Sequence, residues 1–240
     1  MKKKFFSSPL LSPNPLALIL GYIYWIVYQV FLGSFLVWLL PELGVDISTA
    51  QGNATLQLSY MLINLVAVLL IFHRFLLASL RDMRGKIKRT ILSVLLGFGI
   101  YFILNWQVTI VYALFELEPR NLNQGTIDIL MNETPWQMLL CSVVFAPIVE
   151  ELLFRGLFFA PLYRKVPILA YAVSALLFAA VHVVGAIGIL PWSEILLCLV
   201  QYLPPGIALG IVYQRTGNIF GPMLLHFAIN FIASAAVFGL

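Results

Sequence analysis

Seven apolar segments, each long enough to cross the hydrocarbon core of a membrane as a helix, dominate this 240-residue chain. They lie near 16–40, 57–75, 90–115, 136–162, 167–189, 193–213 and 218–240. Hydrophobic residues make up 62% of the chain and charged residues 10%, whereas soluble domains carry about 25% charged residues. A soluble fold could not bury so much apolar surface. We therefore predict an all-α membrane protein with about seven transmembrane helices in a single membrane domain, 1–240. An eighth span or a re-entrant piece is compatible with the pattern.

The charged residues alternate between the two sides of such a bundle. With seven crossings, 13 of the 14 Lys and Arg residues lie on one side, and Arg120 is the exception. Most loop acids lie opposite, namely Glu42, Asp46, Glu116, Glu118, Asp128, Glu133 and Glu194, while Asp82 is on the basic side. Basic loops remain in the cytoplasm. The sequence thus predicts a multi-pass protein with its N-terminus in the cytoplasm and its C-terminus outside.

The N-terminal segment and the cysteines narrow the setting further. Three lysines follow Met1, but the apolar run after Pro15 is too long for a cleavable signal peptide and is expected to remain as the first span. Cys141 and Cys198 fall in apolar runs, so they indicate no disulfide framework. The net charge of +4 comes from loop residues and does not indicate nucleic-acid binding. Short loops favour a prokaryotic plasma membrane, or the endoplasmic reticulum in a eukaryote.

Three of the spans contain polar side chains at membrane depth. These are Glu150, Glu151 and Arg155 in the fourth, His182 in the fifth, and His226 with Asn230 in the seventh. An ionisable group there costs roughly 2.5 kcal/mol or more unless it is paired or hydrated, so each is a candidate functional residue. At a rise of about 1.5 Å per residue, Glu150, His182 and His226 reach comparable depths. We expect them to meet near the middle of the bilayer.

Helix spacing separates the two glutamates. Glu151 and Arg155 are four residues apart, which favours an ion pair on one helix face. Glu150 is five residues from Arg155 and is left without a partner on its own helix, as a general base acting on water requires. Pro147 removes the backbone hydrogen bond to the Val143 carbonyl, and a kink there could widen a pocket beside Glu150. A purely structural role for the Glu151–Arg155 pair is equally compatible with the spacing.

The histidine motifs also have structural interpretations when each is considered alone. A histidine in an apolar helix, such as His182 with Phe178 one turn away, is more often a packed core residue than a catalyst. His226 and Asn230 share a helix face and could form an interhelical hydrogen-bonding pair. Their common depth in three separate helices is what favours one functional site.

Taken in order, these motifs resemble those of the CPBP family, the type II CAAX prenyl endopeptidases and Abi-type membrane proteases. The matching residues are Glu150-Glu151-x-x-x-Arg155, Phe178-x-x-x-His182 and His226-x-x-x-Asn230. Gly156 after Arg155 and the segment 216–225 before His226 agree as well, although Phe220 stands where many relatives carry Trp. The resemblance covers 135–232 as a CPBP-like catalytic core, while the three spans within 1–134 carry no motif.

The resemblance implies an intramembrane endopeptidase whose partners are the lipid bilayer and a membrane-embedded or lipidated, CAAX-like peptide substrate. It implies that Glu150 and His182 activate water, and that His226 and Asn230 stabilise the oxyanion. A side-chain amide can serve as such a donor. The same family pattern gives Glu151, Arg155 and Phe178 supporting roles.

Zinc held by Glu150, His182 and His226 is the alternative chemistry, because two histidines and a glutamate can ligate zinc. The sequence has no helical H-E-x-x-H pair, and no cysteine joins the motifs. We therefore favour a mechanism without metal or other cofactor.

Two other functions are compatible with a polar site inside a helical bundle. Buried acids and histidines relay protons in transporters, and Pro204-Pro205 is expected to break the sixth span, as transporter helices are often broken. A non-catalytic scaffold or immunity factor could use the same architecture to bind a membrane partner. Proton-flux and peptide-cleavage measurements distinguish these functions.

Overall fold

The computed structural model describes residues 10–239, and its regular elements in this range are helices. Seven helical segments are long and apolar enough to cross a membrane: Pro15–Glu42, Ala50–Arg84, Ile87–Leu114, Pro135–Tyr163, Pro167–Ala186, Trp192–Thr216 and Phe220–Val237. The predicted all-α fold and the seven predicted spans are confirmed. Lys2, Lys3, Lys4 and Leu240, on which the predicted termini depend, lie outside the described residues.

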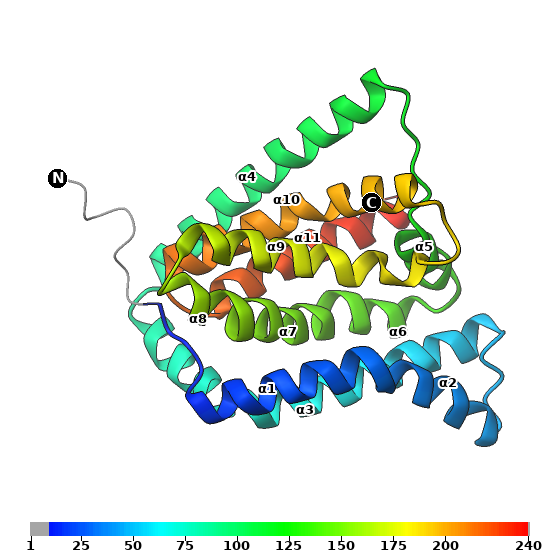
Figure 1. Ribbon diagram of the computed structural model, residues 1–240, viewed down its shortest axis with the longest axis horizontal. Coiled ribbons are helices and arrows are strands. Elements are labelled where there is room, and N and C mark those ends of the chain that lie inside the picture. Colours follow the sequence, from blue (N-terminus) through cyan, green and yellow to red (C-terminus); the bar gives the residue numbers. More distant parts are fainter. Residues whose placement is uncertain (1–9, 240) are drawn as a thin grey trace.

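Several spans are divided into consecutive helices (Figure 1). The first comprises α1 (Pro15–Val27), η1 (Tyr28–Leu32) and α2 (Gly33–Glu42); the fourth comprises α6 (Pro135–Leu139), η2 (Leu140–Phe145), α7 (Ala146–Glu151), η3 (Leu152–Phe159) and α8 (Ala160–Tyr163). The fifth is α9 (Pro167–Val183) with η4 (Val184–Ala186). The others are single helices: α3 (Ala50–Arg84), α4 (Ile87–Leu114), α10 (Trp192–Thr216) and α11 (Phe220–Val237).

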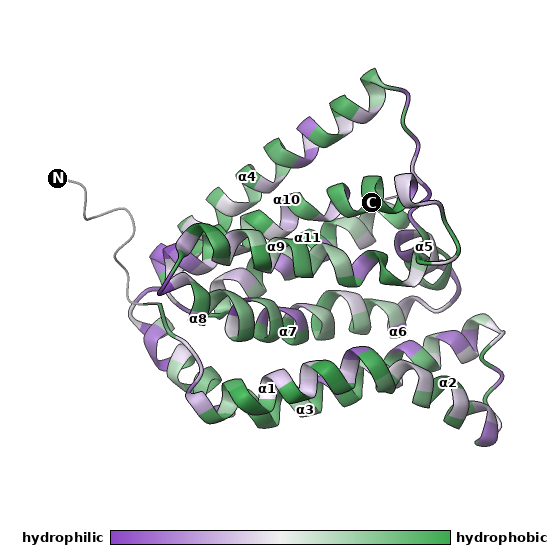
Figure 2. Ribbon diagram, in the orientation of Figure 1, coloured by the Kyte–Doolittle hydropathy of each residue, from purple (hydrophilic) through white to green (hydrophobic). Residues whose placement is uncertain are grey.

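The fourth span occupies the centre of the bundle. Over the most apolar 18-residue stretch of this span, 61% of the residues are buried, whereas the corresponding share in every other span is at most 44%. Helices α1 and α3 pack on one side of it, and α9 and α11 contact it from the other, with α10 and α4 beyond (Figure 1). The helices of the bundle consist mostly of apolar residues, while polar residues gather at its two ends and on α7 (Figure 2). The ionisable residues of the fourth span are thus enclosed by protein.

The backbone of the fourth span widens on both sides of the two glutamates. η2 and η3 are π-helical, and α7 between them carries Glu150 and Glu151. Such π segments are rare and frequently occur at functional sites. Pro147 is the second residue of α7, and η2 ends two residues before it. The sequence predicted a kink at Pro147, and the structure has a π-helical segment just before this position.

Small residues allow the helices around the fourth span to approach closely. A Cβ atom added to Gly206 on α10 would lie 3.0 Å from the Ala175 Cα atom on α9. On α4, a Cβ atom on Gly97 would lie 2.2 Å from the Val212 Cγ2 atom. Association in membranes depends on such contacts because lipid is as apolar as the side chains.

Helix α3 extends further than the sequence predicted. It runs to Arg84, and only Gly85 and Lys86 separate it from α4. Most of the expected basic loop is therefore helical, which arginine favours because it is a good helix former. Asp82 on this extension binds Lys86 at 2.5 Å and accepts a hydrogen bond from Asn218 at 3.3 Å. These contacts join the basic ends of α3, α4 and the turn before α11.

A short helix, α5 (Leu122–Glu133), occupies the segment that the sequence assigned to a loop between the third and fourth spans. Asn121 caps it, because its Oδ1 atom accepts a hydrogen bond from the Gln124 backbone N–H at 3.0 Å. At 12 residues α5 is too short to cross a membrane. It is not an eighth span but a cover at one end of the bundle (Figure 1).

The expected break at Pro204-Pro205 is wrong. Helix α10 is continuous from Trp192 to Thr216 with both prolines inside it. Transmembrane helices tolerate proline because neighbouring helices and local backbone adjustment satisfy the freed carbonyl groups. The sixth span therefore does not have the broken helix that is typical of transporters.

The packing of α4 predicts a difference between two of its glycines. Gly97→Val should destabilise the protein by about 1–3 kcal/mol, because the new side chain overpacks the contact with α10. Gly99→Val is the matched control, since a Cβ atom there would have no atom within 4 Å beyond the nearby backbone of its own helix. Thermal unfolding in detergent should show a lower midpoint for the first variant and little change for the second. Equal midpoints would contradict this packing.

Candidate active site

The structure brings the ionisable residues of three spans together. The Glu150 Oε2 atom lies 3.9 Å from the His182 Nε2 atom and 4.0 Å from the His226 Nε2 atom. Glu150 and His226 are 9% and 4% exposed. The Glu150 Oε2 atom is buried and has no hydrogen-bond partner among the described residues. The convergence expected from helix depth is therefore present, with one carboxylate oxygen facing two imidazole rings.

The orientation of His182 is fixed by its own helix. Its Nδ1 atom lies 2.7 Å from the Phe178 carbonyl oxygen. A carbonyl can only accept a hydrogen bond, so the His182 Nδ1 atom carries a proton, and the Nε2 atom is the ring nitrogen that lies toward Glu150. The Phe178 ring packs against both histidines, with centroids 4.7 Å from His182 and 5.6 Å from His226. Phe178 thus contributes packing that holds both rings.

Glu151 joins Arg155 to His226. Its Oε1 atom accepts a hydrogen bond from the Arg155 Nη1 atom at 3.0 Å, and the His226 Nδ1 atom lies 2.9 Å from the same oxygen. The side chains of Glu151 and Arg155 are fully buried. The predicted ion pair is confirmed, and the contact with His226, 75 residues away, was not predicted.

Arg155 is held on its other sides as well. Its Nη2 atom donates to the Gly206 carbonyl oxygen at 2.9 Å, and its Cζ atom lies 4.9 Å from the centre of the Phe178 ring. A guanidinium offers several donors in a fixed plane and can stack on an aromatic face. The close approach of α9 and α10 at Gly206 places this carbonyl beside the fourth span. Arg155 therefore ties the fourth, fifth and sixth spans to one carboxylate.

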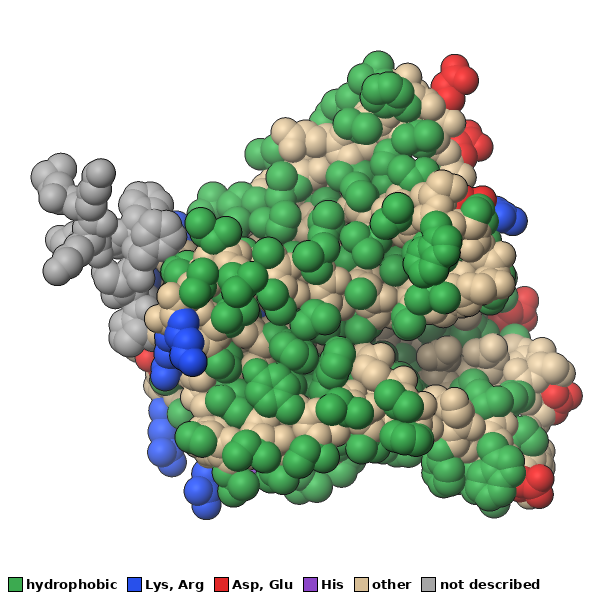
Figure 3. Space-filling view, viewed as in Figure 1, with side chains coloured by type: hydrophobic (Ala, Val, Ile, Leu, Met, Phe, Trp, Pro, Cys, Tyr) green, Lys and Arg blue, Asp and Glu red, His purple; other side chains and the backbone are tan. Residues whose placement is uncertain are grey.

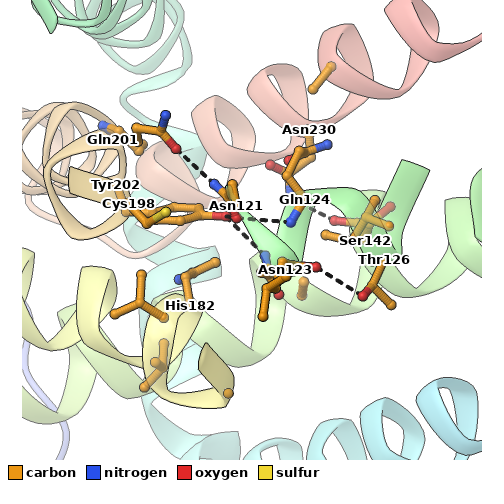
Figure 4. A pocket seen from close by; sticks show the side chains of 18 of the residues that line it. Asn121, Asn123, Gln124, Thr126, Ser142, His182, Cys198, Gln201, Tyr202 and Asn230 are labelled. Carbon is orange, nitrogen blue, oxygen red and sulfur yellow. Dashed lines mark hydrogen bonds between the residues drawn. The ribbon is translucent and has the colours of Figure 1, made fainter. Parts of the chain in front are cut away.

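Asn230 lies one turn beyond His226 on α11. Its Nδ2 atom donates a hydrogen bond to the Ser142 carbonyl oxygen of η2 at 2.7 Å. The amide group has a second N–H, and Asn230 lines the same cavity as Glu150 and His182. Figure 4 shows Asn230 and Ser142 on one wall of the cavity and His182 on another.

The candidate site lies in a cavity of about 870 Å³. Besides the motif residues, the spans before residue 134 supply part of its wall, including Tyr28 from η1 and Gln57 and Tyr60 from α3. Polar side chains of α5 and α10 line another part, as Figure 4 shows. Sequence motifs gave no indication that the first three spans line the site.

Tyr202 is a site residue that the sequence motifs missed. Its ring stacks on His182 with centroids 4.4 Å apart and planes inclined by 25°. Its hydroxyl donates to the Asn121 Oδ1 atom and accepts from the Asn123 Nδ2 atom, both at 3.1 Å. The polar pair Gln201-Tyr202 inside an apolar span was the available sequence signal. Tyr202 thus packs against the His182 ring in addition to Phe178.

The geometry does not match the zinc alternative. Bonds of about 2.0–2.1 Å to a tetrahedral zinc ion place two ligand atoms roughly 3.3 Å apart. Here the Glu150 Oε2 atom is 3.9 Å from His182 and 4.0 Å from His226. Among residues 10–239, no group of three His, Cys, Asp or Glu side chains is arranged to hold a metal ion.

Together, the fold and the site define a multi-pass helical membrane protein with a carboxylate and two imidazoles at the base of an internal cavity. Comparison with known proteins shows what the chain is similar to. Residues 132–232 match the family described as Type II CAAX prenyl endopeptidase Rce1-like. This range contains the three motifs found in the sequence. No solved structure matches the chain.

Two relatives extend the comparison. UPF0177 protein YvdC of Lactococcus lactis subsp. lactis (strain IL1403) is 24% identical over 228 residues, which cover 94% of this chain and 84% of that protein. Putative membrane peptidase YdiL of Bacillus subtilis (strain 168) is 29% identical over 169 residues, which cover 69% of this chain and 64% of that protein. The three motifs lie within the matched range, and over most of its length the chain is similar to these two proteins.

The buried contacts of Arg155 predict two different responses to substitution. Arg155→Ala should destabilise the protein by about 3–5 kcal/mol, because it leaves the Glu151 carboxylate buried without its cation. The double variant Glu151→Leu, Arg155→Met should regain most of this stability, since apolar residues can replace a buried pair. The measurements are thermal unfolding in detergent and the yield of folded protein. An Arg155→Ala variant as stable as the wild type would contradict the assignment.

Proposed function

We propose that this protein hydrolyses a peptide bond of a membrane-associated substrate, using water activated by Glu150 and His182. The observation that carries the proposal is the Glu150 Oε2 atom, which faces two imidazole Nε2 atoms at about 4 Å and has no hydrogen-bond partner among the described residues. A general base needs such a free acceptor within reach of water. The family match supports a protease of the CAAX endopeptidase type.

The spacing of Glu150 and His182 suits a shared water molecule. Two groups about 4 Å apart can both bond to one water, which then donates one hydrogen bond to the carboxylate and the other to the His182 Nε2 lone pair. The water oxygen keeps its lone pairs for attack on a carbonyl carbon. Tyr202 and Phe178 hold the imidazole ring in place for this step.

His226 and Asn230 are suited to stabilise the oxyanion that the attack produces. Because Glu151 accepts the His226 Nδ1–H, a donor at the His226 Nε2 atom requires the doubly protonated ring. The Glu151 carboxylate next to it stabilises that cation. The second N–H of Asn230 supplies the other donor.

The proposed hydrolysis is balanced in atoms and charge. As the water oxygen bonds to the carbonyl carbon, its proton passes to Glu150 and the carbonyl oxygen takes the negative charge. When the carbon–nitrogen bond breaks, the protonated Glu150 returns that proton to the leaving amine. The products are a carboxylic acid and an amine, and no redox partner or other cofactor is needed.

Glu150→Gln is the direct test of the proposed base. Glutamine keeps the shape of glutamate but cannot accept a proton, so cleavage should fall by about 10²–10⁴-fold while thermal stability is retained. We would compare the termini of membrane peptides in cells that produce wild-type or Glu150→Gln protein, using Glu42→Gln at an exposed end of the bundle as the matched control. Cleavage products that persist in Glu150→Gln would contradict the mechanism and move the base role to Glu151.

Metal removal tests the remaining chemical alternative. Purified protein that has been exhaustively treated with a chelator should retain its cleavage activity, because no proposed step uses a metal ion. The measurements are the cleavage rate before and after treatment and the zinc content by elemental analysis. Loss of activity that added zinc restores would overturn the metal-free mechanism.

A further inference from the structure

The cavity that holds the site extends toward only one end of the bundle. On every long helix that lines it, the lining residues come from the same half: 57–61 of α3, 101–112 of α4, 198–205 of α10 and 226–237 of α11. Helix α5 and the segment around Asn121 add to the wall at that end. The opposite end, where α3 passes into α4 and α8 into α9, contributes no lining residue.

The two ends of the bundle differ in charge. The described Lys and Arg residues are concentrated at the end away from the cavity, where α3, α8 and α10 finish. Figure 3 shows these side chains at one end, and most of the acidic side chains, together with a hollow in the surface, near the other. Because basic segments remain in the cytoplasm, the hollowed end belongs on the non-cytoplasmic side.

We propose that the active-site cavity opens to the non-cytoplasmic face and that the substrates are peptide segments exposed at that face. The class of substrate in this inference rests on the proposed function. The side of the membrane on which the cavity opens rests on the charge distribution. A prenylated C-terminal peptide in the cytoplasm would meet the basic end of the bundle, which contributes no residue to the wall of the active-site cavity. The substrate class is instead a membrane protein or peptide whose cleaved segment has crossed to the outer leaflet.

The wall near the opening has the chemistry to bind a peptide main chain. Asn121, Asn123, Gln124 and Gln201 line it with neutral amide groups, which donate and accept hydrogen bonds as peptide groups do. The Asn121 Nδ2 atom already donates to the Gln201 Oε1 atom at 2.9 Å, so a substrate strand would meet an ordered wall (Figure 4).

The same wall lacks a free cation that could bind a terminal carboxylate. Arg120 is the one Lys or Arg residue among the lining residues within 10–239, and it binds Glu194 through two hydrogen bonds of 2.9 and 3.1 Å. A volume of about 870 Å³ is near the upper end for ligand pockets. These features favour an internal, extended peptide segment over a free C-terminus.

Thiol labelling in sealed vesicles tests the side on which the cavity opens. In a Cys141→Ser, Cys198→Ser background, single cysteines would be placed at Ser142 in the cavity, at Thr126 on its rim and at Lys88 on the basic end. Val144→Cys is the matched control for Ser142→Cys, because Val144 lies two residues away in η2, is 38% exposed and does not line the cavity. The probe is a charged thiol reagent that cannot cross membranes.

We expect the reagent to label Ser142→Cys and Thr126→Cys in right-side-out vesicles, Lys88→Cys only in inside-out vesicles, and Val144→Cys in neither. Labelling of Ser142→Cys only in inside-out vesicles, or in neither preparation, would overturn the proposal. The readout does not require turnover. Failure here and loss of the proposed catalytic role of Glu150 are therefore distinguishable.

Discussion

The arrangement of this protein depends on a carboxylate that is fully buried and shared. Glu151 accepts from Arg155 and contacts His226 through one oxygen, while Arg155 also binds the Gly206 carbonyl. Two charges in a membrane interior are tolerated only when they are paired and hydrogen-bonded. These contacts hold the fourth, sixth and seventh spans in one relative position. Glu150, the preceding residue, is thereby placed near His182 and His226, and its buried Oε2 atom has no hydrogen-bond partner among the described residues.

The different contacts of Glu150 and Glu151 explain why the motif contains two adjacent glutamates. Neighbouring positions on a helix point about 100° apart, so one side chain can face Arg155 while the other faces the cavity. The π-helical segments η2 and η3 on either side of α7 give the span an irregular backbone at this level. The cavity beside Glu150 is lined from both halves of the chain, so the spans without motifs also shape the space that a substrate would occupy.

Much of this architecture was predictable because the signals are local. Hydropathy gave the seven spans, and four-residue spacing gave the Glu151–Arg155 pair. Other features depend on contacts between distant segments, such as Glu151 with His226 and Tyr202 with His182 and Asn121. No local pattern encodes them. Helix α5 was missed because it is short and polar. The predicted break at Pro204-Pro205 was wrong because neighbouring membrane helices stabilise a continuous α10.

The central claim is that Glu151 acts through His226, whereas Glu150 acts on water. A double-mutant cycle on Glu151→Gln and His226→Ala, measured as the cleavage rate of one identified substrate, tests it most directly. If the two residues form one unit, the double variant should be hardly slower than the His226→Ala variant alone. Thermal unfolding of all three variants separates lost catalysis from lost folding. Independent losses that multiply in the double variant, with all proteins folded, would contradict the account.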